Sequence, residues 1–355
     1  MVIVITVSQI TPGGGLSKYI CTLADILTKD TDNQLYVLTT HPSEVNPQLD
    51  QLKAERGVQH ISLGGLSTLK KYLALSSQLR KLSPDVLINN YNATTQYILP
   101  FLPKKTKVVH VIHGITDDFY RVASINGKLV DKWVIPTPAL EKEFNTYTKG
   151  KYKDRIVTIP HAVDEALDRF VKKESEFIQL TFVGVLYEHK GVLILPDVIK
   201  RLTDKRSKFH FTFIGDGVLR NDLETVLNEE VSKGIVEFTG RIDSKVVYQK
   251  LQQTDIFVYP THIDSFGLVI AEAMMNGAVP VVTCLKGITD TIVDAGINGY
   301  LETQDDVDGF VEHISYLIEN DEERKRMSEA AINKANTCFS KEVMKRNYTD
   351  MISSL

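Results

Sequence analysis

The sequence predicts an α/β protein with two doubly wound parallel sheets, and three observations support that prediction. Short apolar runs, the first of them VIVITV, alternate with longer amphipathic segments, as expected for strands joined by crossover helices. The alternation stops at a charged segment of low hydrophobicity, residues 171–177, and then starts afresh. The chain has 355 residues and 43% hydrophobic content, which is enough to form two separate cores.

We therefore expect two Rossmann-like domains, the first over residues 1–170 and the second over residues 178–338. The amphipathic tail, residues 341–355, is expected to pack back onto the first domain. Ligands of doubly wound sheets bind beyond the carboxyl ends of the strands, so site residues should lie in the loops at these ends.

In the first half, a buried strand at residues 2–8 leads into the glycine loop TPGGG, which opens an amphipathic helix. Glycines allow a ligand to approach the backbone at a helix N-terminus, where unpaired N–H groups favour an anion. A helix from Leu69 to Leu82 and a strand leading to His113 and Gly114 follow. A single histidine is more often structural than catalytic, yet His113 falls on the ligand-binding edge. Further strands are expected at QLYVLTT, DVLINN, WVIPT and RIVTIPHAVD.

A nicotinamide-dependent dehydrogenase would need the pattern GxGxxG in this glycine loop and an acidic residue at the end of the second strand. The loop reads GGGLSK, and the second strand ends in Thr39 and Thr40. Because both requirements fail, the dehydrogenase interpretation is rejected.

The second half repeats the alternation, with glycine turns at strand ends. QLTFVGVLYEHKG places Lys190 in a loop after a strand, FHFTFIGDG leads into a turn at residues 215–217, and Arg241 follows the strand at 236–240. The strand IFVYP ends at Pro260 and precedes DSFGLVIAE, where a helix is expected to start near Phe266.

Asp264 and Glu272 within DSFGLVIAE are candidates for ligand contact. They are expected at the mouth of the loop and about two helical turns inside, on roughly one side of the helix. The unpaired N–H groups at such a helix start suit an anion or sugar hydroxyls. Taken alone, the two residues also fit a second interpretation, an acidic residue favouring the helix dipole and a solvated helical glutamate.

Composition excludes several other classes of protein. The three cysteines have no CxxC or Cys/His spacing, which argues against a disulfide framework or a zinc site. No stretch reaches the roughly 18 apolar residues of a membrane span. VIVITV lacks a basic lead and a cleavage site, so we expect a first strand rather than a signal peptide, and a cytoplasmic protein.

Charge is distributed unevenly along the chain. Residues 1–170 hold 20 Lys and Arg against 16 Asp and Glu, a net of +4, whereas the remainder holds 21 against 29, a net of −8. Basic residues of the first half lie in clusters along the sequence. Clusters of this kind are usually solvated, but they also allow peripheral contact with the anionic inner face of a membrane. Nucleic acid is not expected as a partner, because the basic runs lack interleaved aromatic residues. The basic residues cluster at Lys70, Lys71, Arg80, Lys81, Lys104, Lys105 and Lys107.

The ordered set of motifs resembles the retaining GT-B glycosyltransferases of glycosyltransferase family four, the group 1 glycosyltransferases. The family's hallmark is two acidic residues separated by seven others, here Asp264 and Glu272. The resemblance implies two Rossmann-like domains that face each other across a cleft. It covers nearly the whole chain, through PGGG, the strand leading to His113, IPHAVD, GVLYEHKG, IGDG, VEFTGRI, DIFVYPTHIDSFGLVIAEAM, GAVPVVT and GINGYL.

The resemblance implies roles for individual residues. Glu272 would receive the ribose hydroxyls of a nucleoside diphosphate sugar, and Lys190 would neutralise the diphosphate leaving group. With Lys190, His113 and Asp264 would form the catalytic set at the donor sugar. No metal or other cofactor is expected, because Lys190 and the helix N-terminus supply positive charge. The further donor-binding residues would be Gly14, Gly15, Gly184, Gly215, Arg241, Ser265, Phe266, Gly267 and Leu268.

The chain also departs from the family pattern. Val185 stands where an arginine is common, and removing such a cation lowers the rate on the order of 10- to 1000-fold, unless Arg241 or another cation replaces it. Asp264 stands where glutamate is usual, which retracts the acid by one methylene. His161 and Ala162 replace Asn-Gly, and residues 286–287 read Lys-Gly in place of two glycines.

We therefore expect a metal-independent retaining hexosyltransferase that moves a sugar from a UDP- or GDP-linked donor to a glycan or lipid-linked acceptor. The acceptor would bind the first domain, and the pathway would be cell-surface polysaccharide or glycoconjugate biosynthesis. Two alternatives remain open. One, suggested by Val185 and Asp264, is a catalytically weakened partner of another transferase that binds a sugar nucleotide or glycan. The other is a UDP-sugar 2-epimerase of the same architecture.

Overall fold

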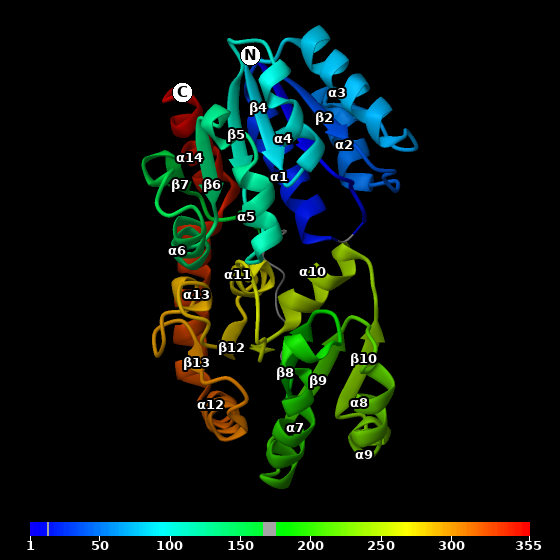
Figure 1. The fold of residues 1–355 in the computed structure, drawn as a ribbon. Helices are drawn as coiled ribbons and strands as arrows, with labels where there is room; N and C mark the ends of the chain where they lie inside the picture. Colours follow the sequence, from blue (N-terminus) through cyan, green and yellow to red (C-terminus); the bar gives the residue numbers. More distant parts are fainter. Residues whose placement is uncertain (13, 166–174) are drawn as a thin grey trace. The chain divides into compact units, whose positions relative to one another are not determined.

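The computed structural model describes residues 1–12, 14–165 and 175–355 of the chain. They form two compact units, the first made of residues 1–162 and 341–355 and the second of residues 163–340 (Figure 1). Each unit contains one parallel sheet and its own helices, which confirms the predicted α/β class with two doubly wound sheets. The predicted domain end at residue 170, most of the predicted linker and Gly13 lie outside the described residues.

The first sheet has seven parallel strands whose side chains alternate between two cores. Ile3 and Ile5 of the first strand lie in one core and Val4 lies in the other, as the alternation of side chains along a strand requires. Burial on both faces accounts for the continuous apolar runs in the sequence. From edge to edge the strands are β3 (Gln59–Ser62), β2 (Gln34–Thr39), β1 (Val2–Val7), β4 (Val86–Asn90), β5 (Lys107–Val111), β6 (Lys132–Ile135) and β7 (Ile156–Thr158).

Helices cover both faces of this sheet. The core that contains Ile3 is completed by α1 (Gly15–Thr28), α2 (Pro47–Arg56) and α14 (Lys341–Ser353). The core that contains Val4 is completed by α3 (Thr68–Leu82), α4 (Ala93–Ile98), α5 (Asp117–Ser124) and α6 (Pro138–Tyr147). Short 3-10 turns are η1 (Leu99–Phe101), η2 (Gly127–Leu129) and η3 (Lys153–Arg155). Tyr348 of α14 hydrogen-bonds to Tyr19 of α1 through the two hydroxyls, so the end of the chain packs within the first unit.

The second sheet has six parallel strands around a core rich in phenylalanine, including Phe182, Phe211 and Phe213. From edge to edge the strands are β10 (Val236–Gly240), β9 (Phe209–Ile214), β8 (Ile178–Val183), β11 (Ile256–Tyr259), β12 (Val279–Thr283) and β13 (Tyr300–Glu302). The helices are α7 (Leu195–Asp204), α8 (Arg220–Val226), α9 (Asn228–Ser232), α10 (Ser244–Gln253), α11 (Leu268–Met275), α12 (Val307–Glu319) and α13 (Asp321–Phe339), with 3-10 turns η4 (Glu188–Lys190), η5 (Val192–Ile194) and η6 (Thr289–Thr291).

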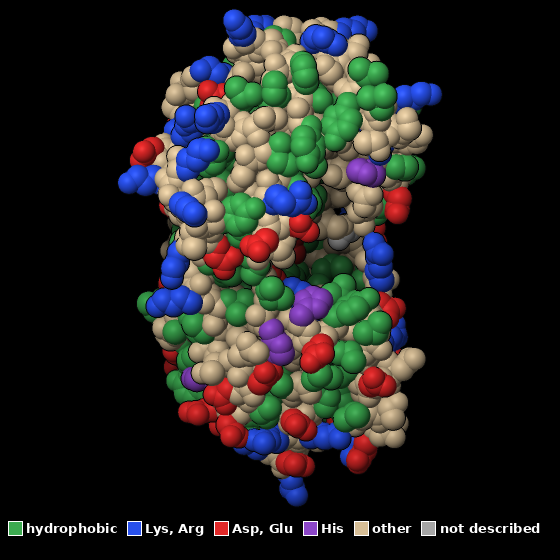
Figure 2. Space-filling model, viewed as in Figure 1, with side chains coloured by type: hydrophobic (Ala, Val, Ile, Leu, Met, Phe, Trp, Pro, Cys, Tyr) green, Lys and Arg blue, Asp and Glu red, His purple; other side chains and the backbone are tan. Residues whose placement is uncertain are grey.

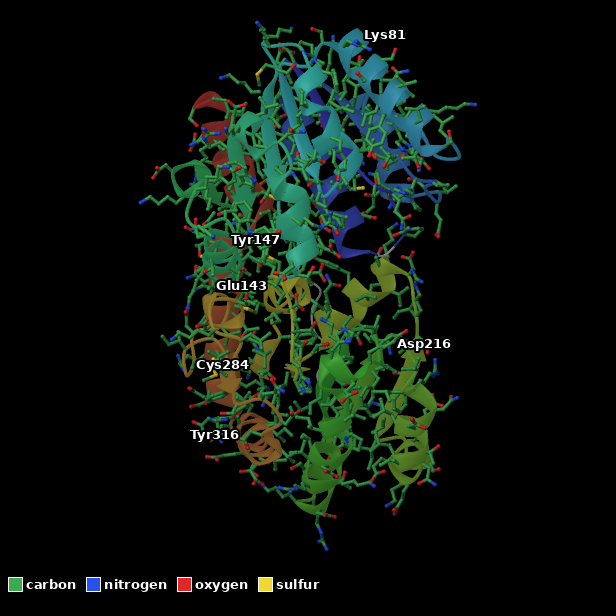
Figure 3. All side chains as sticks on the ribbon, viewed as in Figure 1. Lys81, Glu143, Tyr147, Asp216, Cys284 and Tyr316 are labelled. Carbon is green, nitrogen blue, oxygen red and sulfur yellow. The ribbon has the colours of Figure 1, made fainter. Side chains whose placement is uncertain are left out.

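The two units differ in charge. The first holds 22 Lys and Arg against 15 Asp and Glu, a net of +7, whereas the second holds 19 against 30, a net of −11. Figure 2 shows acidic side chains scattered over the viewed face of the second unit and basic ones around the first. In Figure 3, Lys81 marks the C-terminal end of α3 on the surface of the first unit.

In each sheet the strand order reverses beside the first strand of the unit. β1 lies between β2 and β4, and β8 lies between β9 and β11. Ligands of doubly wound sheets bind outside the carboxyl ends of the strands at this switch point. Site residues are therefore expected at the ends of β1 and β4 in the first unit and of β8 and β11 in the second.

Candidate functional site

Two loops of the second unit meet at the carboxyl ends of β8 and β11. The loop after β8 ends in η4, and Gly191 follows with a φ of +66°. A β-carbon at Gly191 would lie 1.7 Å from the carbonyl oxygen of Pro260, so the position requires glycine. This close approach of the two loops brings Lys190 to the residues that follow β11.

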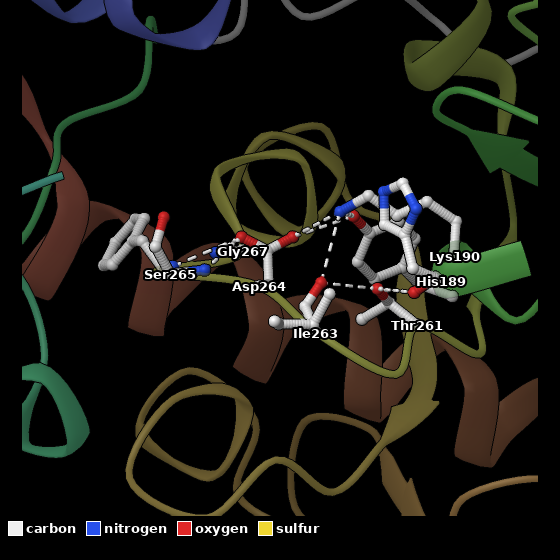
Figure 4. Close-up of polar contacts among 9 residues, drawn as sticks. His189, Lys190, Thr261, Ile263, Asp264, Ser265 and Gly267 are labelled. Atoms are coloured by element: carbon white, nitrogen blue, oxygen red, sulfur yellow. Dashed lines mark hydrogen bonds and ion pairs between the residues drawn. The ribbon is translucent and has the colours of Figure 1, made fainter. Parts of the chain in front are cut away.

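Lys190, Tyr259 and Asp264 form a hydrogen-bonded cluster at this point (Figure 4). The Lys190 ammonium lies 3.0 Å from Asp264 Oδ2 and donates to the Tyr259 hydroxyl at 2.9 Å. That hydroxyl in turn donates to Asp264 Oδ2 at 2.9 Å. A third, longer contact of 3.4 Å joins the ammonium to the carbonyl oxygen of Ile263. The structure thus brings two of the three predicted catalytic residues into direct contact.

Burial and charge act in opposite directions on Asp264. Burial favours its neutral form, but the Lys190 charge and the hydrogen bonds from Lys190 and Tyr259 outweigh it, so the pKa of Asp264 lies below its usual value. Burial and the neighbouring Asp264 carboxylate raise the pKa of Tyr259 well above that of a free tyrosine. Tyr259 therefore stays a protonated donor while Asp264 stays an anion.

Asp264 also accepts hydrogen bonds from its own loop. Its Oδ1 atom receives the N–H groups of Ser265, Phe266 and Gly267 at 2.8, 3.2 and 3.0 Å. An aspartate side chain is short enough to reach the N–H groups that follow it, as in an Asx turn. These N–H groups were predicted to hold the donor, and here they hold Asp264. For them to contact a donor, Asp264 would have to turn away.

The helix after this loop begins at Leu268, two residues later than predicted. Gly267 takes a φ of +91°, which ends the turn around Asp264 before regular helix can start. Glu272 lies within α11 and is buried. Burial, and then the charges of Glu272 and Asp164, raise the pKa of the Tyr248 hydroxyl. Glu272 is thus a buried acid near a phenol, and its predicted contact with ribose stays a prediction.

Glycines close the ends of β8 and β9. Gly215 has a φ of +134°, and a β-carbon there would lie 1.9 Å from the carbonyl oxygen of Gly184. This packing gives Gly215 a structural role beside its predicted role in donor binding. Val185, where an arginine is common in the family, is 45% exposed. Arg241 follows β10, which β9 separates from β8, so the strand order does not place it beside Lys190.

The first unit presents the other predicted residues. Gly14 precedes α1 as its N-cap without a side-chain cap, and a β-carbon at Gly15 would meet no atom within 4 Å. The start of α1, which follows β1, is a helix N-terminus, a position that favours anions.

His113 lies just beyond β5. Its Nε2 atom is 2.9 Å from Oδ1 of Asn90, the last residue of β4. Burial, and then the neighbouring His161 and His110, lower the pKa of His113 well below its usual value. Because an amide oxygen only accepts, the proton of this neutral ring lies on Nε2, and Nδ1 remains an acceptor.

Several site residues escaped sequence reasoning. Tyr259 is the next-to-last residue of the predicted strand IFVYP and the last residue of β11, so its place near a strand end was the available signal. Asn90 likewise ends a predicted strand. Tyr19 packs edge-on against His113, with the ring centroids 4.8 Å apart. The ring centroids of Tyr19 and His161 are 4.6 Å apart. No local pattern signals that contact, because these residues are distant in the sequence.

Two doubly wound parallel sheets, each with polar residues at the strand ends of its switch point, define the GT-B class of protein. The crystal structure of Anabaena HepE in complex with UDP is similar to this chain over 100% of both chains, with a TM-score of 0.80 and 17% sequence identity. Residues 163–334, nearly the whole second unit, match the family described as glycosyl transferases group 1. This part of the chain is similar to the group 1 glycosyltransferases.

Relatives are found along most of the chain. An uncharacterized glycosyltransferase of Methanocaldococcus jannaschii is 24% identical over 330 residues, which cover 89% of this chain and 88% of the relative. The UDP-Gal:alpha-D-GlcNAc-diphosphoundecaprenol alpha-1,3-galactosyltransferase of Escherichia coli is 25% identical over 284 residues, 71% of this chain and 70% of that enzyme. The alignments with two other curated relatives cover 31% and 57% of their length. Among the described residues, no helix is both long and apolar enough to cross a membrane.

Proposed function

We propose that the protein is a retaining hexosyltransferase of glycosyltransferase family four. It moves a sugar from a nucleoside diphosphate donor, UDP- or GDP-linked, to a glycan or lipid-linked acceptor. The observation that supports this most directly is the contact between Lys190 and Asp264 at the switch point of the group 1 domain. The UDP bound to HepE favours a uridine donor, and the named acceptor of the Escherichia coli relative favours a lipid-linked acceptor.

Lys190 supplies the positive charge that the departing diphosphate requires. Its ammonium is held by Tyr259 and Asp264, so little reorganisation is needed as negative charge develops on the leaving group. Together with the N-terminus of α11 in the same unit, this charge makes the reaction independent of a metal ion and of any other cofactor. Asp264 contacts the donor sugar after it releases its own loop.

The reaction follows front-side displacement, as the resemblance to glycosyltransferase family four implies. The departing phosphate oxygen takes the proton of the acceptor hydroxyl, while the neutral His113 ring orients the donor sugar through its Nδ1 acceptor. Glu272 receives the two ribose hydroxyls, since a carboxylate accepts neighbouring O–H donors well. The protein acts in the cytoplasm, where it contributes to a cell-surface polysaccharide or glycoconjugate.

A panel of UDP-, GDP- and ADP-sugars tests this proposal by thermal shift and by turnover. A ligand at about 100 times its Kd stabilises the folded state by about 2.7 kcal/mol, which raises the melting temperature measurably. Lys190→Met and Glu272→Gln should both lose that stabilisation. The matched controls are Lys245→Met and Glu319→Gln, both at exposed positions of the same unit. If no sugar nucleotide binds or turns over, the proposal fails.

A second candidate is a sugar-nucleotide-binding partner of another transferase. The exposed Val185, in place of a second diphosphate cation, is the observation that favours it. Slow hydrolysis of the bound donor without an acceptor would reject this candidate, because a binding partner leaves the donor intact.

A further inference from the structure

The first unit exposes a group of large apolar side chains on α3, α4 and η1 and in the loop before α3. They are Leu66, Leu69, Leu73, Tyr97 and Phe101, of which Leu69 is 70% exposed and Phe101 is 64% exposed. Figure 2 shows hydrophobic side chains gathered over α3 and α4 on the viewed face of this unit. Contiguous apolar exposure of this kind marks an interaction site rather than an ordinary surface.

The pattern of α3 explains the exposure. Leu75 and Leu79 fill the core beneath the helix, whereas Leu69 and Leu73, one turn apart, face solvent. The rings of Tyr72 and Tyr97 meet edge to face with centroids 6.1 Å apart, which joins α3 to α4. The exposed apolar residues of the two helices are therefore parts of one rigid surface.

Basic residues flank these apolar side chains. None of the five basic residues that are named at the end of this paragraph has an ion-pair partner within the part of the chain that the structure describes. Residues 57–84 and 86–116 contain no Asp or Glu, and Asp85 between them is paired with Lys105 at 3.3 Å. The five basic residues are Lys70, Lys71, Arg80, Lys81 and Lys104.

We propose that this α3 surface, the five apolar and five basic residues above, docks on an anionic lipid bilayer. Apolar side chains insert into the boundary between headgroups and acyl chains, while long basic side chains extend to lipid phosphates. A second copy of the chain is a poorer occupant, because a symmetric interface would oppose the same basic residues. Nucleic acid would satisfy the charges but leave the leucines uncovered.

Vesicle flotation tests the proposal with the full-length protein and needs neither donor nor acceptor. Its outcome is therefore independent of the transferase activity. The protein should float with vesicles of phosphatidylcholine and phosphatidylglycerol in a 7:3 ratio and not with phosphatidylcholine alone. Because each basic residue near an anionic surface contributes about fivefold, Lys70→Glu with Lys81→Glu should weaken binding at least about 30-fold. Leu69→Ser with Leu73→Ser should weaken it about tenfold.

Matched controls keep the test specific. Lys142→Glu with Lys153→Glu makes the same change in charge elsewhere on the first unit, and Leu129→Ser with Val45→Ser removes two exposed apolar side chains outside the surface. Both controls should float like the wild type. Equal binding to neutral vesicles, equal losses in the controls, or no binding to either vesicle would overturn the proposal. So would a concentration-dependent dimer, seen by sedimentation, that Leu69→Ser with Leu73→Ser abolishes without vesicle binding, because the surface would then belong to a second copy.

Discussion

The Lys190 ammonium lies 3.0 Å from the Asp264 carboxylate, and each side chain is only 17% exposed. The same carboxylate accepts three N–H groups of its loop, so one anionic side chain holds the cation and the backbone donors of the switch point together. A diphosphate that reaches Lys190 must share these positive groups with Asp264 or displace it. Donor binding at this site is therefore an exchange of anions.

The exchange predicts an unusual result for Asp264→Asn. The amide keeps the shape of the side chain but removes its charge, so a nucleoside diphosphate no longer competes for Lys190. Affinity for that diphosphate should rise about tenfold, about 1.4 kcal/mol, while turnover falls. Calorimetric titration measures the affinity, and Asp305→Asn, at an exposed position of the same unit, serves as the control. A parallel loss of affinity and turnover would show instead that Asp264 helps to bind the diphosphate.

Val185→Arg should raise turnover. Position 185 follows Gly184 at the end of β8 and is exposed rather than part of the core, so an arginine fits without displacing core atoms. A second cation at the diphosphate is expected to increase kcat about tenfold or more, because it stabilises charge on the leaving group. The control is Val218→Arg, which adds the same charge at an exposed position after β9. Equal gains in both variants would point to a general effect of net charge.

Gly215→Ala should destabilise the second unit by about 2–4 kcal/mol. The new β-carbon would lie 1.9 Å from the Gly184 carbonyl oxygen, and the φ of +134° is itself unfavourable for alanine. Gly234→Ala is the matched control, because Gly234 also has a positive φ but would place its β-carbon in open space. That control should lose only about 1–2 kcal/mol. Urea denaturation of both variants separates the cost of the steric contact from the cost of the positive φ. Equal losses of stability in the two variants would contradict a role for the contact with Gly184.

The sequence was sufficient for the fold because strands and helices have local signals. Alternating apolar runs located the strands, and the helix predicted from Leu69 to Leu82 spans Thr68–Leu82 in the structure. Loops at strand ends also have local sequence signals. Lys190 and Asp264 could therefore both be assigned to loops after strands before their contact was known.

What depended on strand order or on side-chain conformation could not be predicted. Arg241 occupies a strand end like the others, but β10 lies at the edge of its sheet, and no local pattern encodes that order. The turn of Asp264 onto Ser265, Phe266 and Gly267 is a choice of rotamer. The hydroxyl contact between Tyr19 and Tyr348 joins positions 329 residues apart.

Stability should fall in mild acid because the first unit buries neutral histidines. Burial lowers the pKa of His110 to about 3, against about 6.5 in an unfolded chain. A depressed pKa means that the unfolded state binds the proton first, so this stabilisation is complete above about pH 6.5 and is lost progressively as the pH falls toward 3. His110 alone contributes a slope of about 1.4 kcal/mol per pH unit in that window.

His110→Gln keeps an acceptor near the Asn89 amide, which lies 3.3 Å from the His110 ring, but removes the titration. Urea denaturation between pH 7 and pH 5 should therefore show a shallower decline in the variant, whereas an unchanged slope would assign the acid sensitivity to carboxyl groups.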